Sequence, residues 1–210
     1  MMRLSEQDHD RVATAIRAAE QRTSGEIYCV VAGTSDSYFY PAATFALVGT
    51  LVAGAVCAFV LDHWWMNVRL PHFVMAQIFG ALAVLLVLLV VPRLRILLVP
   101  AYLRQRRAHD NAVKQFLAHN VHLTSARTGI LIFLSLSERY AEVIADAGIA
   151  ERVRQEDWDA IVAGLTGRAA AGRLADGLVE AVGAAGSLLA EHFPPDGSRL
   201  DELPDRVVEI

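Results

Sequence analysis

Two long stretches of uncharged residues dominate the pattern of the first half of this chain. Tyr38–Leu61 and Phe73–Val91 contain no formal charge, and each is long enough to cross a bilayer as a helix, which takes roughly 20 apolar residues. A buried helix of a soluble protein usually keeps a polar stripe along one edge. The pattern therefore predicts a transmembrane hairpin at residues 37–99, with spans at about 41–61 and 73–91.

The segment before the first span has the pattern of a helix followed by a strand. Ser5, with Asp8 three residues later, indicates a helix N-terminus, and apolar residues then recur at helical spacing as far as Arg22. Glu26–Val31 is rich in β-branched and aromatic residues, which favour a strand. Residues 1–36 are therefore expected to form the first part of a domain.

The segment after the second span continues with helix and strand patterns. Ala101–His122 is polar with apolar residues on one side, which predicts a helix. Ile130–Leu136 is apolar except for Ser135, a pattern typical of a strand covered on both faces. Tyr140–Asp146 follows a short turn and is expected to pair back as a hairpin.

Two amphipathic helices and a polar tail complete the chain. Apolar residues recur at helical spacing from Trp158 and again from Leu174 to Leu189. Residues 100–193 are therefore expected to form the remainder of the domain. Two prolines follow, and the polar residues 194–210 are expected to form a flexible tail.

The segments on either side of the hairpin are expected to share one sheet. An isolated strand at Glu26–Val31 would not be stable, so it must pair with the later strands, which requires both segments to lie on the same side of the membrane. An even number of spans satisfies this condition. The expected fold is an α/β domain, a sheet flanked by helices, interrupted by an inserted two-helix transmembrane hairpin.

Arginines flank the hairpin on the side of both chain ends. Short segments rich in Lys and Arg mark the cytoplasmic side of a membrane, so both termini are expected to be cytoplasmic. The arginines after the second span could also contact anionic lipid headgroups. The alternative is that they only set the orientation of the hairpin in the membrane. The arginines before and after the hairpin are Arg3, Arg11, Arg17 and Arg22, and Arg93, Arg95, Arg104, Arg106 and Arg107.

Composition narrows the cellular setting. The net charge of −4 provides no global basic field, so no nucleic-acid partner is expected. Lys114 is the only lysine, and this preference for Arg together with abundant Ala suggests a GC-rich bacterial genome and hence the bacterial inner membrane. Cys29 in a predicted strand and Cys57 in a predicted span are too far apart to pair, which indicates free thiols in a reducing compartment.

Three acidic residues form the candidate metal site. Glu138, Glu142 and Asp146 are spaced by four, and side chains at even spacing share one face of a strand. Clustered carboxylate oxygens are the ligands of Ca²⁺ or Mg²⁺. The alternative is an ordinary half-solvated sheet face, because Glu138 falls near the turn.

Two other groups have simple structural interpretations. Acidic residues surround the expected start of the Trp158 helix, where carboxylates favour the helix dipole; a catalytic or metal role is the alternative. His119 and His122 have a spacing that could share a metal, but a zinc site needs at least three protein ligands. The acidic residues are Glu151, Glu156, Asp157 and Asp159.

The segment after the hairpin resembles a known family. Arg127–Arg139, followed by Val143–Ile149 and Trp158, is similar to the TPM domain family, and most similar to its branch of bacterial predicted membrane proteins. The resemblance covers roughly residues 4–193. It implies a central sheet flanked by helices, and relatives credited with acid phosphatase activity and divalent-metal binding, or with membrane-bound assembly and repair. No catalytic residue is carried over.

Two functions remain open at this point. The first is a membrane-anchored cytoplasmic TPM-like domain that acts as a binding or assembly module, with the lipid bilayer and other membrane proteins as partners. The alternative is a divalent-metal-dependent acid phosphatase that uses the three spaced carboxylates. No nucleophile elbow or phosphate-binding Gly-rich loop is present in the sequence to favour the enzyme.

Overall fold

The computed structural model describes residues 4–64, 68–124, 126–195 and 203–210. The chain divides into two compact units, one made of residues 1–35 with 105–210 and the other of residues 36–104. The second unit is therefore an insertion in the first, because the chain leaves the first unit after Ser35 and returns to it at Gln105.

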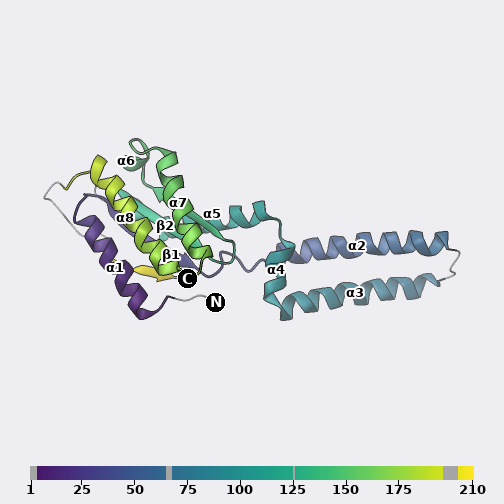
Figure 1. Cartoon of the computed structure of the whole chain (residues 1–210). Helices are drawn as coiled ribbons and strands as arrows, with labels where there is room; N and C mark the ends of the chain where they lie inside the picture. Colours follow the sequence, from purple (N-terminus) through teal and green to yellow (C-terminus); the bar gives the residue numbers. More distant parts are fainter. Residues whose placement is uncertain (1–3, 65–67, 125, 196–202) are drawn as a thin grey trace. The chain divides into compact units, whose positions relative to one another are not determined.

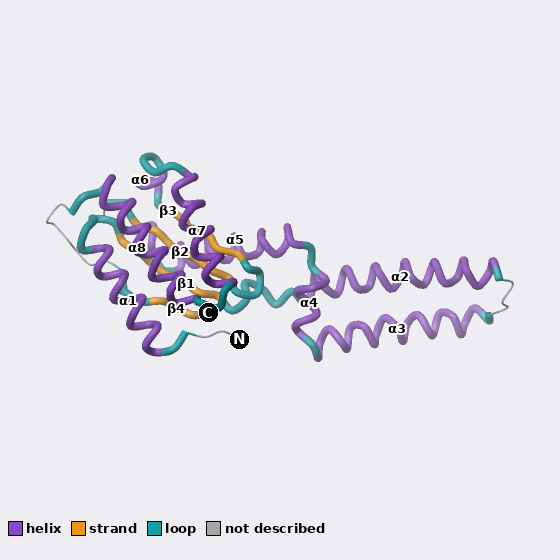
Figure 2. Tube along the Cα trace, in the orientation of Figure 1, coloured by secondary structure: helices purple, strands orange, loops and turns teal. Residues whose placement is uncertain are grey.

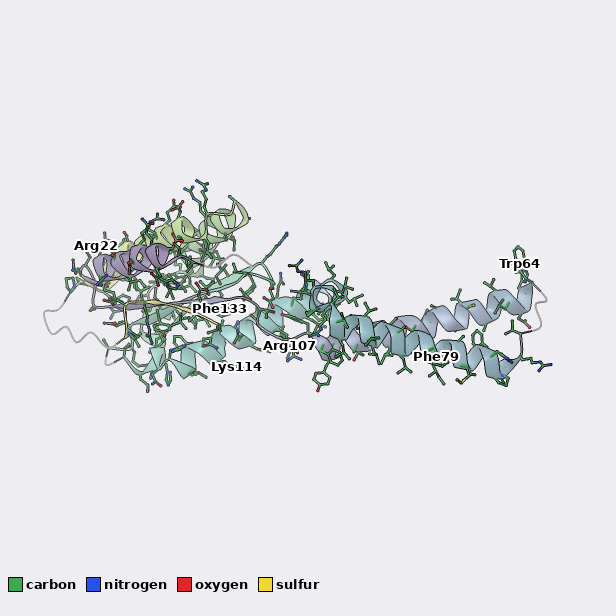
Figure 3. The ribbon with its side chains drawn as sticks, turned by 90° about the horizontal axis from the view of Figure 1, so that it is seen from below. Arg22, Trp64, Phe79, Arg107, Lys114 and Phe133 are labelled. Carbon is green, nitrogen blue, oxygen red and sulfur yellow. The ribbon has the colours of Figure 1, made fainter. Side chains whose placement is uncertain are left out.

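The inserted unit consists mainly of two apolar helices, α2 (Phe39–His63) and α3 (Leu70–Val90), which lie side by side (Figure 1). The most apolar part of each helix is almost fully exposed: 0% of its residues are buried in α2 and 6% in α3. A core helix would bury these residues. Both helices are long and apolar enough to cross a membrane, as the two uncharged stretches predict. Trp64, at the end of α2, is 74% exposed (Figure 3).

A short helix, α4 (Pro92–Leu98), follows α3 directly. Residues from the start of α2, the end of α3 and the end of α4 form a small buried cluster that holds this end of the hairpin together. The cluster consists of Tyr38, Ala42, Leu88 and Val99. Tyr38 has a left-handed backbone (φ 53°), which turns the chain into α2.

The α/β unit is built on a four-stranded mixed sheet in the order β3-β2-β1-β4. Its strands are β1 (Glu26–Ala32), β2 (Gly129–Ser135), β3 (Tyr140–Ala145) and β4 (Val207–Glu209). Strand β1 is parallel to both β2 and β4, whereas β3 is antiparallel to β2. The expected pairing of the first strand with strands beyond the hairpin is confirmed, because all seven residues of β1 pair with β2.

Helices cover both faces of the sheet (Figure 2). Helices α1 (Glu6–Glu20), α7 (Gln155–Ala170) and α8 (Leu174–His192) pack on one face, and α5 (Ala101–Ala118) packs on the other. All residues of β1 and β2 are buried because both faces are covered. The fold is therefore the expected α/β sheet flanked by helices.

Helix α1 begins as the sequence predicts. The Ser5 hydroxyl accepts a hydrogen bond from the Asp8 N–H (3.2 Å), and the Asp8 carboxylate accepts one from the Ser5 N–H (3.1 Å). This capping box satisfies two N–H groups that a helix end would otherwise leave unpaired.

The first residue of β2 is Gly129, and the close packing there requires a glycine. A Cβ at this position would lie 2.2 Å from the Val121 carbonyl oxygen.

Two features differ from the sequence-based expectation. The expected flexible tail at residues 194–210 is wrong at its end, because Val207–Glu209 forms strand β4 beside β1; residues 196–202 lie outside the described residues. The Ile210 N–H also donates to the Val31 carbonyl (3.0 Å). In addition, a short helix, α6 (Ala147–Ala150), follows β3 directly.

Candidate functional site

Strand β3 forms one edge of the sheet, and half of its main-chain groups point away from β2. The Asp146 N–H donates to the Gly129 carbonyl (2.9 Å), and hydrogen-bonded residues alternate along an antiparallel pair. The N–H and C=O groups of Ala141, Val143 and Ala145 therefore face outward. Within the described residues, no strand lies beyond β3 and no hydrogen bond reaches these groups.

A groove runs along this edge, with a volume of about 320 Å³. Helix α5 provides one wall through His109 and Val113, and the segment from α6 to the start of α7 provides the other through Val153 and Trp158. Binding sites for small ligands usually occupy about 300–1,000 Å³. The groove is therefore large enough for a few side chains of a ligand that lies along β3.

The wall formed by α5 is polar around His109. Glu142 projects from β3 and accepts a hydrogen bond from the His109 Nδ1–H (2.9 Å) and another from the Tyr140 hydroxyl (2.9 Å). Burial, together with the charge of Glu142, raises the pKa of Tyr140 well above its usual value. Tyr140 therefore stays protonated and keeps Glu142 in place on this side of the groove.

The opposite wall is apolar. Trp158 and Val153 are only 3% and 6% exposed, and Val143 and Ala145 of β3 pack on the same side of the sheet. Strand β3 thus presents alternate side chains to two chemically different walls, as the period of two along a strand requires. A second chain that pairs with β3 would place its own alternate side chains against the same two walls.

The structure places the three predicted metal ligands before, within and after β3. Glu142 lies in the groove, whereas Glu138 lies in the preceding turn and is buried. Asp146 caps α6: its Oδ1 accepts from the Ala147 N–H (2.7 Å) and its Oδ2 pairs with Arg127 Nε (2.8 Å). Among the described residues, no group of three or more acidic, His or Cys side chains is placed to hold a metal ion.

Glu138 has its own set of partners. Its Oε1 accepts from the Thr34 hydroxyl (3.2 Å) and the Ser35 N–H (2.9 Å), and its Oε2 accepts from the Ser135 hydroxyl. Ser35 also donates through its hydroxyl to Ser135 (2.9 Å). Glu138 therefore joins the loop after β1 to the end of β2, and its spacing of four from Glu142 does not bring the two carboxylates together.

The other predicted groups have structural partners. Glu156 and Asp157 lie in the first turn of α7, where they pair with Arg154 at 3.6 and 3.4 Å, as the dipole interpretation predicts. His119 Nδ1 lies 3.1 Å from the Tyr28 hydroxyl, and burial lowers the pKa of His119. His122 instead lies beside the ring of Phe116.

A second cleft, of about 410 Å³, lies at the carboxyl ends of β1 and β2. Ligands of open α/β sheets often bind at such an edge. Its hydroxyl groups already have partners, however: Ser137 donates to the Gly33 carbonyl (2.6 Å), and Thr166 donates to the Val162 carbonyl (2.8 Å). The groove beside β3 is the stronger candidate, because main-chain groups of this edge strand have no partner among the described residues.

The groove itself was not predicted from the sequence. The sequence predicts Glu142 as a metal ligand, but its neighbour His109 and the apolar wall around Trp158 come from other segments of the chain. The available signal was the strand order, because the last strand of a hairpin forms a free edge unless a further strand pairs with it.

Comparison with known proteins identifies a similar fold. No protein-family model matches the chain, and no curated protein matches it. The chain is similar to the BA42 protein of the psychrophilic bacterium Bizionia argentinensis, whose structure was solved by NMR. The TM-score is 0.60 and the identity is 19%, over 99% of this chain and 95% of BA42. At this identity the likeness establishes the fold alone.

Proposed function

We propose that this protein is a membrane-anchored binding module that takes an extended peptide segment of a partner protein as an additional strand beside β3. The outward-facing main-chain groups of Ala141, Val143 and Ala145 carry the proposal. Three N–H donors and three C=O acceptors in one row match the hydrogen-bonding pattern of an extended chain. Main-chain pairing would supply affinity, and the groove walls would supply specificity.

The two walls define the chemistry of the peptide. Side chains that face Trp158 and Val153 should be apolar, because this wall is apolar and desolvated. Side chains that face Glu142 should be polar or basic, because the carboxylate lies on that side beside His109. The preferred ligand is a strand of alternating apolar and polar or basic residues.

The inserted hairpin supports the membrane location. Helices α2 and α3 are long and apolar enough to span a bilayer, and arginine-rich segments flank them on the side of both termini. The proposal therefore places the α/β unit and both termini in the cytoplasm, at the bacterial inner membrane. The resemblance of Arg127–Arg139, Val143–Ile149 and Trp158 to the TPM domain family agrees with a binding or assembly role.

A proline on the free edge tests the proposal. The full chain in lipid nanodiscs is screened against a phage library of random heptapeptides, and the selected peptides are measured again with Ala145→Pro. The N–H of Ala145 faces the groove, so proline removes one donor without breaking the β2–β3 ladder. Affinity should fall about five-fold or more, since an unpaired hydrogen-bonding group costs ~1–3 kcal/mol.

Two controls make the result decisive. Ala145→Val adds bulk at the same position and keeps the N–H, so it should retain most of the affinity. Hydrogen exchange should show that peptide binding protects the Val143 amide and that Ala145→Pro leaves the β2 amides protected. Selection of peptides without an alternating pattern, or equal binding by Ala145→Pro, contradicts strand addition.

A phosphatase assay tests the competing function. Release of phosphate from p-nitrophenyl phosphate is measured with Mg²⁺ or Ca²⁺ and with a chelator. The proposal expects no cation-dependent turnover, because the carboxylates of Glu138, Glu142 and Asp146 do not converge. Turnover that is lost in a stable Asp146→Asn variant would argue for the enzyme instead.

A further inference from the structure

The segment that follows α3 carries positive charge and no negative charge. No acidic residue occurs between Asp62 and Asp110, whereas five arginines fall between Pro92 and His109. In most surface segments, acidic residues balance the basic ones. An excess of positive charge beside an apolar hairpin favours contact with anionic lipid headgroups.

Helix α4 also exposes apolar side chains outside the two long helices. Leu94, Leu97 and Leu98 are 37%, 76% and 44% exposed, and Tyr102, at the start of α5, is 66% exposed. The remaining apolar residues of this segment, such as Val99, face the buried cluster at the base of the hairpin. This segment therefore has apolar side chains both in the buried cluster and on its exposed surface.

Arg95 fixes α4 to the end of α3. Its Nε donates to the Leu88 carbonyl (2.8 Å) and its Nη2 donates to the Leu89 carbonyl (3.2 Å), while its guanidinium lies 5.4 Å from the centre of the Phe39 ring. These bonds satisfy carbonyls that the last turn of α3 leaves unpaired. Arg95 is thus occupied, whereas Arg93 is exposed and forms no ion pair within the described residues.

We propose that α4 is an interfacial helix that binds the anionic surface of the membrane leaflet that α3 reaches at its end. Leu94, Leu97 and Leu98 enter the boundary between headgroups and acyl chains, and Arg93 contacts lipid phosphate. Exposed apolar side chains beside an exposed arginine such as Arg93 are typical of helices that lie in this region. The inference rests on the proposed membrane anchoring, since α4 continues directly from α3.

Spin labels measure the depth of α4 in liposomes of phosphatidylcholine and phosphatidylglycerol. The full chain is labelled at Leu97→Cys after Cys57→Ala removes the exposed thiol. Cys29 is left in place, because burial raises its pKa to about 12 and a buried thiol does not react. Collisions with oxygen and with a water-soluble nickel chelate are compared with those of labels at Val52→Cys in α2 and Glu156→Cys in α7.

The expected label at Leu97 resembles Val52 rather than Glu156, with frequent oxygen collisions and few nickel collisions, at a depth of roughly 5–10 Å. Free access of nickel at Leu97 with lipid contact at Val52 overturns the inference and leaves the anchoring intact. Free access at both positions overturns the anchoring. Exclusion of both reagents at Leu97 indicates a protein contact and also overturns the inference.

Lipid selectivity tests the charge. The association of spin-labelled phosphatidylglycerol, relative to phosphatidylcholine, should fall by up to about five-fold in Arg93→Gln, the value of one arginine near an anionic surface. Arg173→Gln removes an exposed arginine of the α/β unit and should leave the ratio unchanged. An unchanged ratio in Arg93→Gln, or an equal decrease in both variants, contradicts the lipid contact.

Discussion

Glu20 and Glu138 lie at opposite ends of the parallel strands, and both are buried, with 2% and 6% of each residue exposed. They differ in the hydrogen bonds they receive. Glu138 accepts from three donors in the loop after β1 and the end of β2, whereas Glu20 accepts from the Ile27 N–H (2.9 Å). Burial alone therefore does not determine whether a carboxyl group is charged or protonated; the hydrogen-bond donors around it also matter.

Glu20 is accommodated in its neutral form. Burial raises its pKa to about 9, and the neighbouring carboxyls of Asp205 and Glu26 act in the same direction. A protonated Glu20 donates a hydrogen bond to Asp205 and still accepts one from the Ile27 N–H. The end of α1 is thus joined to the start of β1 and to the segment before β4 through a carboxylic acid rather than a carboxylate.

The largest expected effect is a dependence of stability on pH. The pKa of Glu20 is raised in the folded state, so its stabilising contribution is fully present below the unfolded value of 4.5 and is lost as the pH rises towards about 9. The unfolding free energy of the α/β unit should therefore fall by a few kcal/mol between pH 5 and pH 8. Hydrogen exchange of the β2 amides in the full chain, corrected for the pH dependence of the intrinsic exchange rate, measures this unfolding free energy.

Glu20→Gln is the matched variant for that prediction. Gln has the shape of the protonated acid and can keep both hydrogen bonds without titrating. The variant should be at least as stable as the parent at pH 8 and should have a flatter pH profile. A profile as steep as that of the parent would show that another group carries the pH dependence.

Glu138→Gln should have the next largest effect. An amide NH₂ group cannot accept, so if the amide oxygen of the variant stays on the Ser35 N–H, the Ser135 hydroxyl loses the acceptor of its hydrogen bond in a buried site. The expected loss is about 1–3 kcal/mol, measured as the shift of the urea midpoint in detergent. Glu142→Gln is the control, because Glu142 is more exposed; it should cost less than about 1 kcal/mol. Equal losses in the two variants would contradict the comparison.

Thr34→Val should have the smallest effect. The change removes one of the three donors to Glu138 and leaves the Ser35 N–H and the Ser135 hydroxyl in place. A net loss of about 0.5–1.5 kcal/mol is expected, the usual value of one hydrogen bond. Combined with Glu138→Gln, Thr34→Val should add less than its separate cost, because the two residues share a contact. Full additivity would show that the contact contributes nothing.

Much of the fold follows from local sequence patterns. The two uncharged stretches predict α2 and α3, and the apolar run Ile130–Leu136 predicts β2, because length and burial are properties of a single segment. Strand β4 was missed for the opposite reason. Only three residues, Val207–Glu209, form it, and they become a strand by pairing with β1, which is remote in sequence.

The candidate site was less accessible from the sequence. The alternation of side chains along β3 correctly separates Glu142 from Val143, but it does not reveal that Glu138 turns towards the loop after β1. Arg139 has a left-handed backbone (φ 53°), so the strand period ends before it reaches Glu138. The even spacing on which the metal-site prediction relied therefore does not extend from β3 across this turn to Glu138.

Strand β1 is synthesised before either of the strands that pair with it. The chain between Ala32 and Gly129 takes roughly 5–20 s to translate, at about 5–20 residues per second. During this interval the hairpin emerges from the ribosome, while a strand that is fully buried in the finished sheet has both edges unpaired. The availability of a chaperone that shields nascent apolar strands should therefore limit the yield of this protein more than the yield of proteins whose paired strands are close in sequence.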